Sequence, residues 1–156
     1  VAAGDYLLSC VAGISIWALP LDRQVIDPLA LTEPFLARLP ARSDPRVGHY
    51  ERALPSGFMV SRLGSANRLA APELAQLYED VQLATRSPTL LSRARLAALW
   101  RLNTGHYRDM GRYFDRDDIS LREIGIDDNR LRALNAESQQ PRLTVCINMI
   151  PIRTSP

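Results

Sequence analysis

Lysine is absent from this chain of 156 residues, and all nineteen basic residues are arginine. Folding does not require this, because exposed positions in most proteins accept either residue. Codon bias in a GC-rich genome explains a complete absence. Selection for bidentate recognition of phosphate or carboxylate is the alternative, since the planar guanidinium does this better than an ammonium group.

Several protein classes are disfavoured by what else is missing. The net charge is only +2, and no basic stripe with interleaved aromatic residues occurs, so we predict no nucleic-acid partner. No apolar run reaches the about 18 residues that a transmembrane helix needs, so the chain as given is expected to be soluble. A nucleophile elbow, a phosphate-binding glycine loop and a dinucleotide fingerprint are also missing.

Metal-binding patterns are equally scarce. The two cysteines, Cys10 and Cys146, lie in separate apolar runs, and no CxxC pair occurs. They are compatible with a disulfide or with two buried thiols. Asp115, Asp117 and Asp118 resemble the start of a calcium loop, but the fifth-position ligand and the sixth-position glycine are lacking. We therefore predict no metal and no cofactor.

The composition that is present indicates a globular protein. Apolar residues make up 46% and charged residues 23% of the chain, and the length allows one domain with a core. The predicted fold class is α/β, a single small mixed domain over residues 1–156 with a short sheet flanked by helices. The predicted strands span residues 6–12, 23–27 and 143–150, and the flanking helices begin near Thr32, Pro72 and Leu91.

Two helices are predicted from apolar periodicity. Residues 71–86 form the clearest one, with Pro72 in its first turn, Glu73 at the favourable end of the helix dipole, and one apolar stripe. The stripe comprises Leu74, Leu77, Tyr78 and Val81. In the second helix, residues 91–103, one shared face is predicted for Leu96, Leu99, Trp100 and Asn103.

A candidate binding site begins where the strand at 23–27 ends. Asp27 would lie at the carboxyl end of a strand, where open α/β sheets place their ligand crevices. The alternative is that its carboxylate caps the following helix or pairs with an arginine. Arg38 lies near the far end of that helix, predicted from about Thr32 with the apolar face Phe35, Leu36 and Leu39. It either contributes to the site or extends over the helix end.

The loop at residues 40–58 supplies the other candidates. Its GHYER run places two basic groups, a carboxylate and an aromatic ring in five consecutive residues. Sugar sites use such a mixture of side chains, and a well-tied surface loop is the alternative interpretation. The predicted substrate-binding residues are Asp27, Arg38, His49, Glu51 and Arg52.

The order and spacing of these motifs resemble a known family. Asp27 through Pro40 is followed by Gly48, His49, Glu51 and Arg52, and later by Asn67-Arg68, LYEDVQLATR at 77–86 and LWRLNTGHYR at 99–108. This arrangement is similar to the soluble carboxyl-terminal region of the terminal β-arabinofuranosyltransferases of arabinogalactan-building bacteria. Those enzymes are membrane glycosyltransferases of the GT-C superfamily. The resemblance covers most of residues 5–108, whereas residues 109–156, a charged tail and the last strand, do not match.

The resemblance implies a parent enzyme with membrane-spanning helices ahead of Val1. That enzyme would take a sugar, expected to be arabinofuranose, from a polyprenyl phosphate donor and add it to a cell-wall polysaccharide acceptor. The chain would lie on the outer, periplasmic face of the cytoplasmic membrane, where Cys10 and Cys146 would meet an oxidising compartment. Catalysis would belong to the membrane part, and this domain would bind or position the acceptor glycan.

Two other hypotheses remain open from the sequence. The chain could be a purely structural domain that braces the membrane part, which predicts an exposed apolar patch of several hundred Å². It could also be a free-standing soluble α/β enzyme with an unrecognised site near Asp27 and His49.

Overall fold

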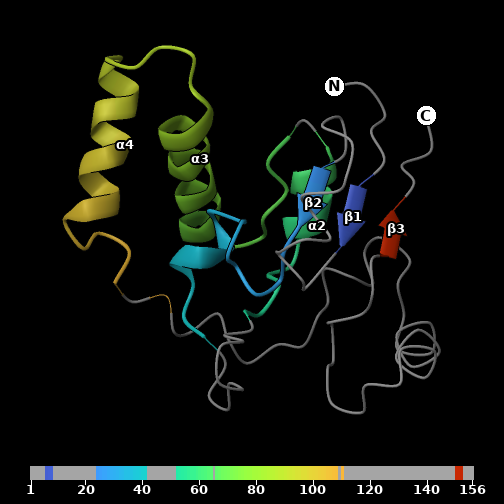
Figure 1. Cartoon of the computed structure of the whole chain (residues 1–156). Helices are drawn as coiled ribbons and strands as arrows, with labels where there is room; N and C mark the ends of the chain where they lie inside the picture. Colours follow the sequence, from blue (N-terminus) through green and yellow to red (C-terminus); the bar gives the residue numbers. More distant parts are fainter. Residues whose placement is uncertain are drawn as a thin grey trace.

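The computed structural model describes residues 6–8, 24–41, 52–64, 66–108, 110 and 150–152 (Figure 1). Several sequence predictions fall outside these residues and are not tested by them. They concern His49, Glu51, the acidic run at 115–118 and both cysteines.

Three very short strands pair into a sheet of order β2-β1-β3. These are β1 (Tyr6–Leu8), β2 (Gln24–Ile26) and β3 (Ile150–Ile152). β1 runs parallel to β2, with Tyr6 opposite Gln24, and antiparallel to β3, with Leu7 opposite Pro151. The last predicted strand, 143–150, stops just before Pro151, but Pro151 lies inside β3. Proline is tolerated there because β3 is an edge strand, which pairs on one side only.

Helices make up most of the regular secondary structure among the described residues. α2 (Phe58–Leu63), α3 (Pro72–Arg86) and α4 (Arg93–Asn103) contain six, fifteen and eleven residues, and each strand contains three. The structure is therefore a small domain that is mostly helical. The finer prediction, an α/β domain organised on a sheet flanked by helices, is not confirmed.

The helix predicted from Thr32 is replaced by turns and one 3-10 turn, η1 (Leu36–Arg38). The Asp27 carboxylate accepts hydrogen bonds from the backbone N–H groups of Leu29 and Thr32, and Ala30 has a positive φ of 64°. These contacts fix the chain in a non-helical course before η1. Phe35, Leu36 and Leu39 are nevertheless buried, so the predicted apolar face of this segment is confirmed.

α3 forms one wall of the core, as its periodicity predicts. Pro72 occupies its first turn, and Leu74, Leu77, Tyr78 and Val81 are all buried. The ring of Phe35 stacks on Phe58 of α2 at 5.4 Å between centroids and meets Tyr78 edge-on at 5.3 Å. Such aromatic pairs add to the burial energy, and here they join the 24–41 segment, α2 and α3.

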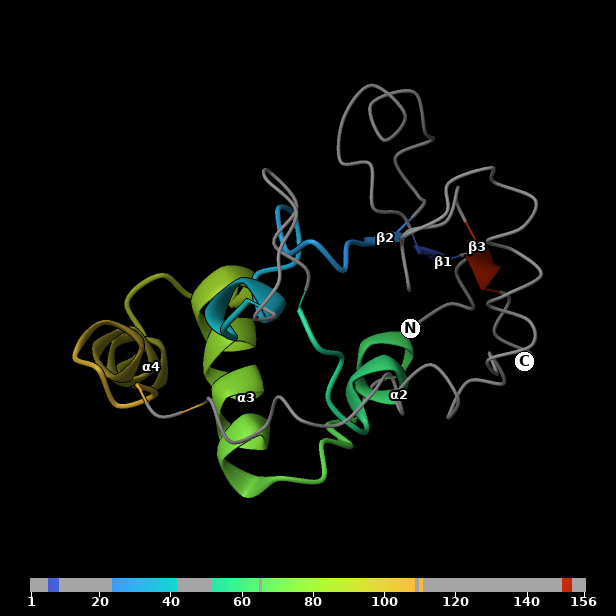
Figure 2. The same ribbon diagram turned by 90° about the horizontal axis from the view of Figure 1, so that it is seen from below.

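α4 packs on the side of α3 that faces away from α2 and the sheet (Figures 1 and 2). Its first turn is capped by Ser92, whose Oγ accepts a hydrogen bond from the N–H of Arg95 at 3.2 Å. Ala98 and Leu102 are the buried residues of α4. Of the predicted face, Leu99 is half-buried, whereas Leu96, Trp100 and Asn103 are exposed, because α4 has a partner on one side only among the described elements.

Candidate functional site

Arg38 connects η1 to the end of α4. Its Nη1 donates a hydrogen bond to the backbone carbonyl of Leu102 at 3.0 Å. The last carbonyls of a helix lack N–H partners within the helix, and a cation at this end is favoured by the helix dipole. Arg38 therefore holds the carboxyl end of α4 against the 24–41 segment, while its side chain stays exposed.

The chain turns sharply after α4 because Gly105 adopts a left-handed conformation, with φ +79°. The backbone N–H of Arg108 donates to the carbonyl of Gly105 at 3.3 Å, and the Arg108 side chain folds back over the glycine. A Cβ atom at position 105 would lie 2.1 Å from Nε of Arg108. The glycine thus permits both the turn and the close approach of the guanidinium.

Tyr107 is held in place by a buried carboxylate. Its hydroxyl donates to Asp80 Oδ2 at 2.5 Å, and Arg101 donates to the same carboxylate through Nε at 2.7 Å and Nη2 at 2.6 Å. Asp80 is 2% exposed, so its charge is compensated almost entirely by these donors. These hydrogen bonds hold α3, α4 and the following turn in contact. We call Asp80, Arg101 and Tyr107 the Asp80 cluster.

The contacts within the Asp80 cluster shift the pKa of each of its three residues. Burial raises the pKa of Asp80, but the hydrogen bonds from Arg101 and Tyr107 outweigh it, so the pKa lies below its usual range. The hydrogen bond to Asp80 raises the pKa of Arg101. Burial and the hydrogen bond to Asp80 raise the pKa of Tyr107 to about 12. Tyr107 is therefore a neutral donor at physiological pH.

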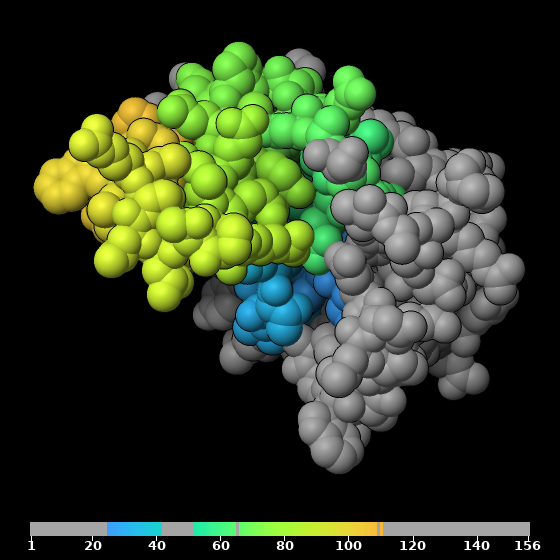
Figure 3. All heavy atoms as spheres, turned by 90° about the horizontal axis from the view of Figure 1, so that it is seen from above, coloured from blue at the N-terminus to red at the C-terminus, as the bar shows by residue number. Residues whose placement is uncertain are grey.

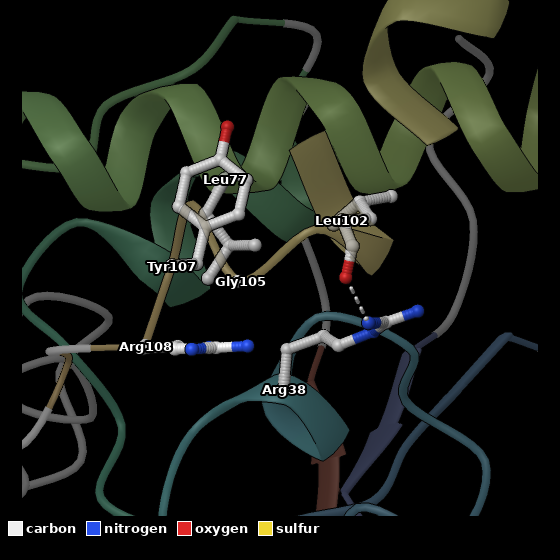
Figure 4. A pocket seen from close by; sticks show the side chains of 6 residues that line it. All are labelled: Arg38, Leu77, Leu102, Gly105, Tyr107 and Arg108. Carbon is white, nitrogen blue, oxygen red and sulfur yellow. Dashed lines mark hydrogen bonds between the residues drawn. The ribbon is translucent and has the colours of Figure 1, made fainter. Parts of the chain in front are cut away.

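These segments line a small, open pocket of about 150 Å³ (Figure 4). Arg38 enters it from η1, and Arg108 enters it from the turn after α4 (Figure 4). The described lining consists of Arg38, Leu77, Leu102, Gly105, Tyr107 and Arg108. None of these six side chains is acidic, and two carry a permanent positive charge.

The described lining of the pocket offers donors and apolar contacts to a small ligand. Its volume of about 150 Å³ has room for a small polar ligand such as one sugar ring or one phosphate group. The guanidinium groups of Arg38 and Arg108 can donate hydrogen bonds to hydroxyl or phosphate oxygens. Leu77 and Leu102 offer apolar contact surface. No nucleophile with an adjacent base occurs among the six lining residues.

The predicted site residues lie in different surroundings. Asp27 is fully buried, and its carboxylate accepts from the N–H groups of Leu29 at 2.9 Å, Leu31 at 2.8 Å and Thr32 at 3.1 Å. The carboxylate accepts from backbone N–H groups as the capping alternative predicts, but the segment that it holds is a turn and not the predicted helix.

Arg52 lies beside the same turn. Its backbone N–H donates to the carbonyl of Pro28 at 3.2 Å, and burial lowers the pKa of its guanidinium. Of the five predicted residues, Arg38 alone is among the six described pocket residues. The roles predicted for His49 and Glu51 remain predictions.

The sequence analysis missed Gly105, Tyr107 and Arg108 as candidate site residues, although the signal was present. The tripeptide Gly-His-Tyr occurs twice, at 48–50 and again at 105–107, and an arginine follows each copy within two residues. The first copy lies in the long loop at 40–58, and long loops often carry functional residues. The second copy forms the pocket because its glycine ends α4.

Neither metal nor membrane-spanning features are found in the described residues. Within them, no three or more His, Cys, Asp or Glu side chains gather as a metal site would require. Their helices are all too short or too polar to cross a bilayer.

Comparisons with protein-family models, with curated proteins and with solved structures gave no match.

Proposed function

We propose that this chain is an extracytoplasmic domain of a polyprenyl-phosphate-dependent glycosyltransferase, and that the pocket binds the end of the acceptor glycan. The observation that supports the proposal is the position of the pocket residues in the sequence. The resemblance rests on several stretches, among them residues 27–40, 77–86 and 99–108. These three stretches supply all six described lining residues.

The chemistry of the pocket fits a sugar end group. A furanose ring presents hydroxyl oxygens along its edge and C–H groups on its faces. Arg38 and Arg108 supply donors for the oxygens, while Leu77 and Leu102 supply apolar contact. The small volume admits one sugar unit, so the rest of the acceptor would lie on the surface outside.

The proposed role is positioning and not catalysis. In this proposal the membrane part of the same enzyme supplies the catalytic carboxylate and takes arabinofuranose from the donor. The domain presents the acceptor on the outer face of the cytoplasmic membrane. A site that only orients one sugar unit binds weakly, and we expect an affinity in the millimolar to high micromolar range, about −4 to −6 kcal/mol.

The test is an NMR titration of the chain with a short arabinofuranose oligosaccharide. In the unaltered chain, we expect saturable shifts at Gly105, Tyr107 and Arg108. Arg108→Gln should weaken binding by about tenfold, because one charged donor is lost. Arg38→Gln should weaken it too, although it also removes the bond to Leu102.

Arg86→Gln is the matched control, since Arg86 is an exposed arginine on α3 that is not among the described pocket residues. It should leave the titration unchanged. If the Arg108→Gln chain is folded and binds the oligosaccharide as tightly as this control, the pocket is not the glycan site.

A further inference from the structure

Four large apolar side chains are exposed on the α3–α4 hairpin. Leu90 and Leu91, in the turn, are 67% and 82% exposed, and Leu96 and Trp100, on α4, are 48% and 72% exposed. Leu96 and Trp100 are four residues apart, so they lie on one face of the helix. We call these four residues the hairpin patch. The hairpin itself projects from one margin of the molecule (Figures 1 and 3).

The segment that carries the hairpin patch has side-chain charges of one sign. From Val81 to Arg108 the sequence contains five arginines and no Asp or Glu. The protein itself engages two of them. Arg101 pairs with Asp80, and Arg95 donates to the carbonyls of Ala84 and Leu90.

Two of the remaining arginines border the hairpin patch. Arg86 ends α3 and Arg93 begins α4, so they flank the turn that carries Leu90 and Leu91. Both are exposed, and neither forms an ion pair within the part of the chain that the structure describes. The surface therefore combines leucines, a tryptophan and unneutralised arginines.

We propose that the hairpin patch docks on the surface of an anionic lipid bilayer. Leucine side chains would enter the boundary between headgroups and acyl chains, and tryptophan is favoured at that depth. Arg86 and Arg93 would meet the lipid phosphates, an attraction that each basic residue near an anionic surface strengthens.

The charge distribution favours a bilayer over a second copy of this chain. A two-fold dimer through the hairpin patch would bring the arginines of both copies together, and residues 81–108 hold no carboxylate to neutralise them. A bilayer supplies many phosphates in one plane. The inference does not rest on the proposed function, because the hairpin patch and the pocket share no residue.

The test is sedimentation of the full chain with lipid vesicles. Vesicles of equal parts phosphatidylglycerol and phosphatidylcholine should bind the chain at least about tenfold more tightly than phosphatidylcholine alone, and added salt should weaken this binding. The double variant Leu91→Gln/Trp100→Gln and the double variant Arg86→Gln/Arg93→Gln should each reduce binding to the anionic vesicles about tenfold or more.

Leu31→Gln is the matched control, because Leu31 is 69% exposed but lies in the 24–41 segment. It should bind as the unaltered chain does. A second measurement locates the contact directly: in a Trp17→Phe chain, brominated lipid should quench the fluorescence of Trp100.

Three results would overturn the proposal. They are equal binding to both kinds of vesicle, a folded Leu91→Gln/Trp100→Gln chain that binds as the control does, or self-association of the chain that this double variant abolishes while no vesicle binding occurs.

Discussion

At the residue scale, the most constrained side chain near the sheet is Asp27. It is fully buried and accepts three backbone hydrogen bonds from the turn that follows β2. Asp27→Asn removes the charge and turns an N–H donor toward N–H groups that need an acceptor. We expect a loss of about 2 to 3 kcal/mol in the free energy of unfolding, since hydrogen bonds to charged groups contribute about that much.

Urea unfolding at pH 7, followed by circular dichroism, measures this loss. Glu79→Gln is the control, because it makes the same change at an exposed site on α3, where we expect an effect below about 0.5 kcal/mol. Similar stabilities for the two variants would show that the Asp27 carboxylate does not hold the turn.

At the element scale, the Asp80 cluster (Asp80, Arg101 and Tyr107) joins α3 to α4. It makes a contribution to the free energy of unfolding that depends on pH. The pKa of Asp80 is lowered in the folded chain. Such a group stabilises the fold above its unfolded pKa of about 3.9. The contribution is lost as the pH falls through the lower, folded pKa.

The measurement compares the unaltered chain with Asp80→Asn between pH 7 and pH 3. The variant should be less stable at pH 7 by about 2 kcal/mol, because Tyr107 and Arg101 lose a charged acceptor. The difference should shrink below about pH 4 as Asp80 becomes protonated. Subtracting the two curves removes the titration of the other carboxylates, and a constant difference across this range would contradict the role of Asp80.

In the alkaline range, the contribution of Tyr107 to stability changes with pH in the opposite direction to that of Asp80. Its pKa is raised to about 12 in the folded chain, so its contribution is complete below its unfolded pKa of about 10 and is lost as the pH rises through 12. Between these limits, Tyr107→Phe should therefore become less damaging to stability as the pH increases.

The elements differ in how well the sequence predicts them, and the reason is their surroundings. α3 has one apolar stripe and one buried face, so its periodicity predicts both its position and its orientation. α4 carries apolar residues on two faces. Ala98 and Leu102 are buried, while the larger Leu96 and Trp100 are exposed, and periodicity alone cannot show which face has a partner.

At the scale of the whole molecule, the described part of the chain is a mostly helical small domain, and the predicted organisation on a sheet is not confirmed. Strands of three residues are too short to show alternation, and an apolar run predicts a buried strand as readily as other buried backbone. The pocket was also beyond prediction, because Arg38 and Arg108 are seventy positions apart in the sequence. They line one space only through the packing of α4 on α3 and the bond from Arg38 to Leu102.

The same scale includes one buried ion pair that joins distant parts of the chain. Glu33, in the 24–41 segment, accepts a hydrogen bond from Nε of Arg62 in α2 at 3.0 Å, and their side chains are 2% and 7% exposed. Removing either partner alone leaves a buried charge without its main compensation. Glu33→Gln and Arg62→Met should each lower the free energy of unfolding by about 3 to 5 kcal/mol.

The double variant Glu33→Leu/Arg62→Met tests whether Glu33 and Arg62 stabilise the fold as a coupled pair. The double variant leaves no buried charge at the pair, so its loss in the free energy of unfolding should be much smaller than the sum of the losses of the two single variants. Apolar replacements of buried ion pairs are often close to neutral. Urea unfolding of the unaltered chain, Glu33→Leu, Arg62→Met and the double variant completes the cycle. Additive losses would mean that Glu33 and Arg62 stabilise the chain independently, whereas a strong positive coupling would show that they hold the 24–41 segment and α2 together as a pair.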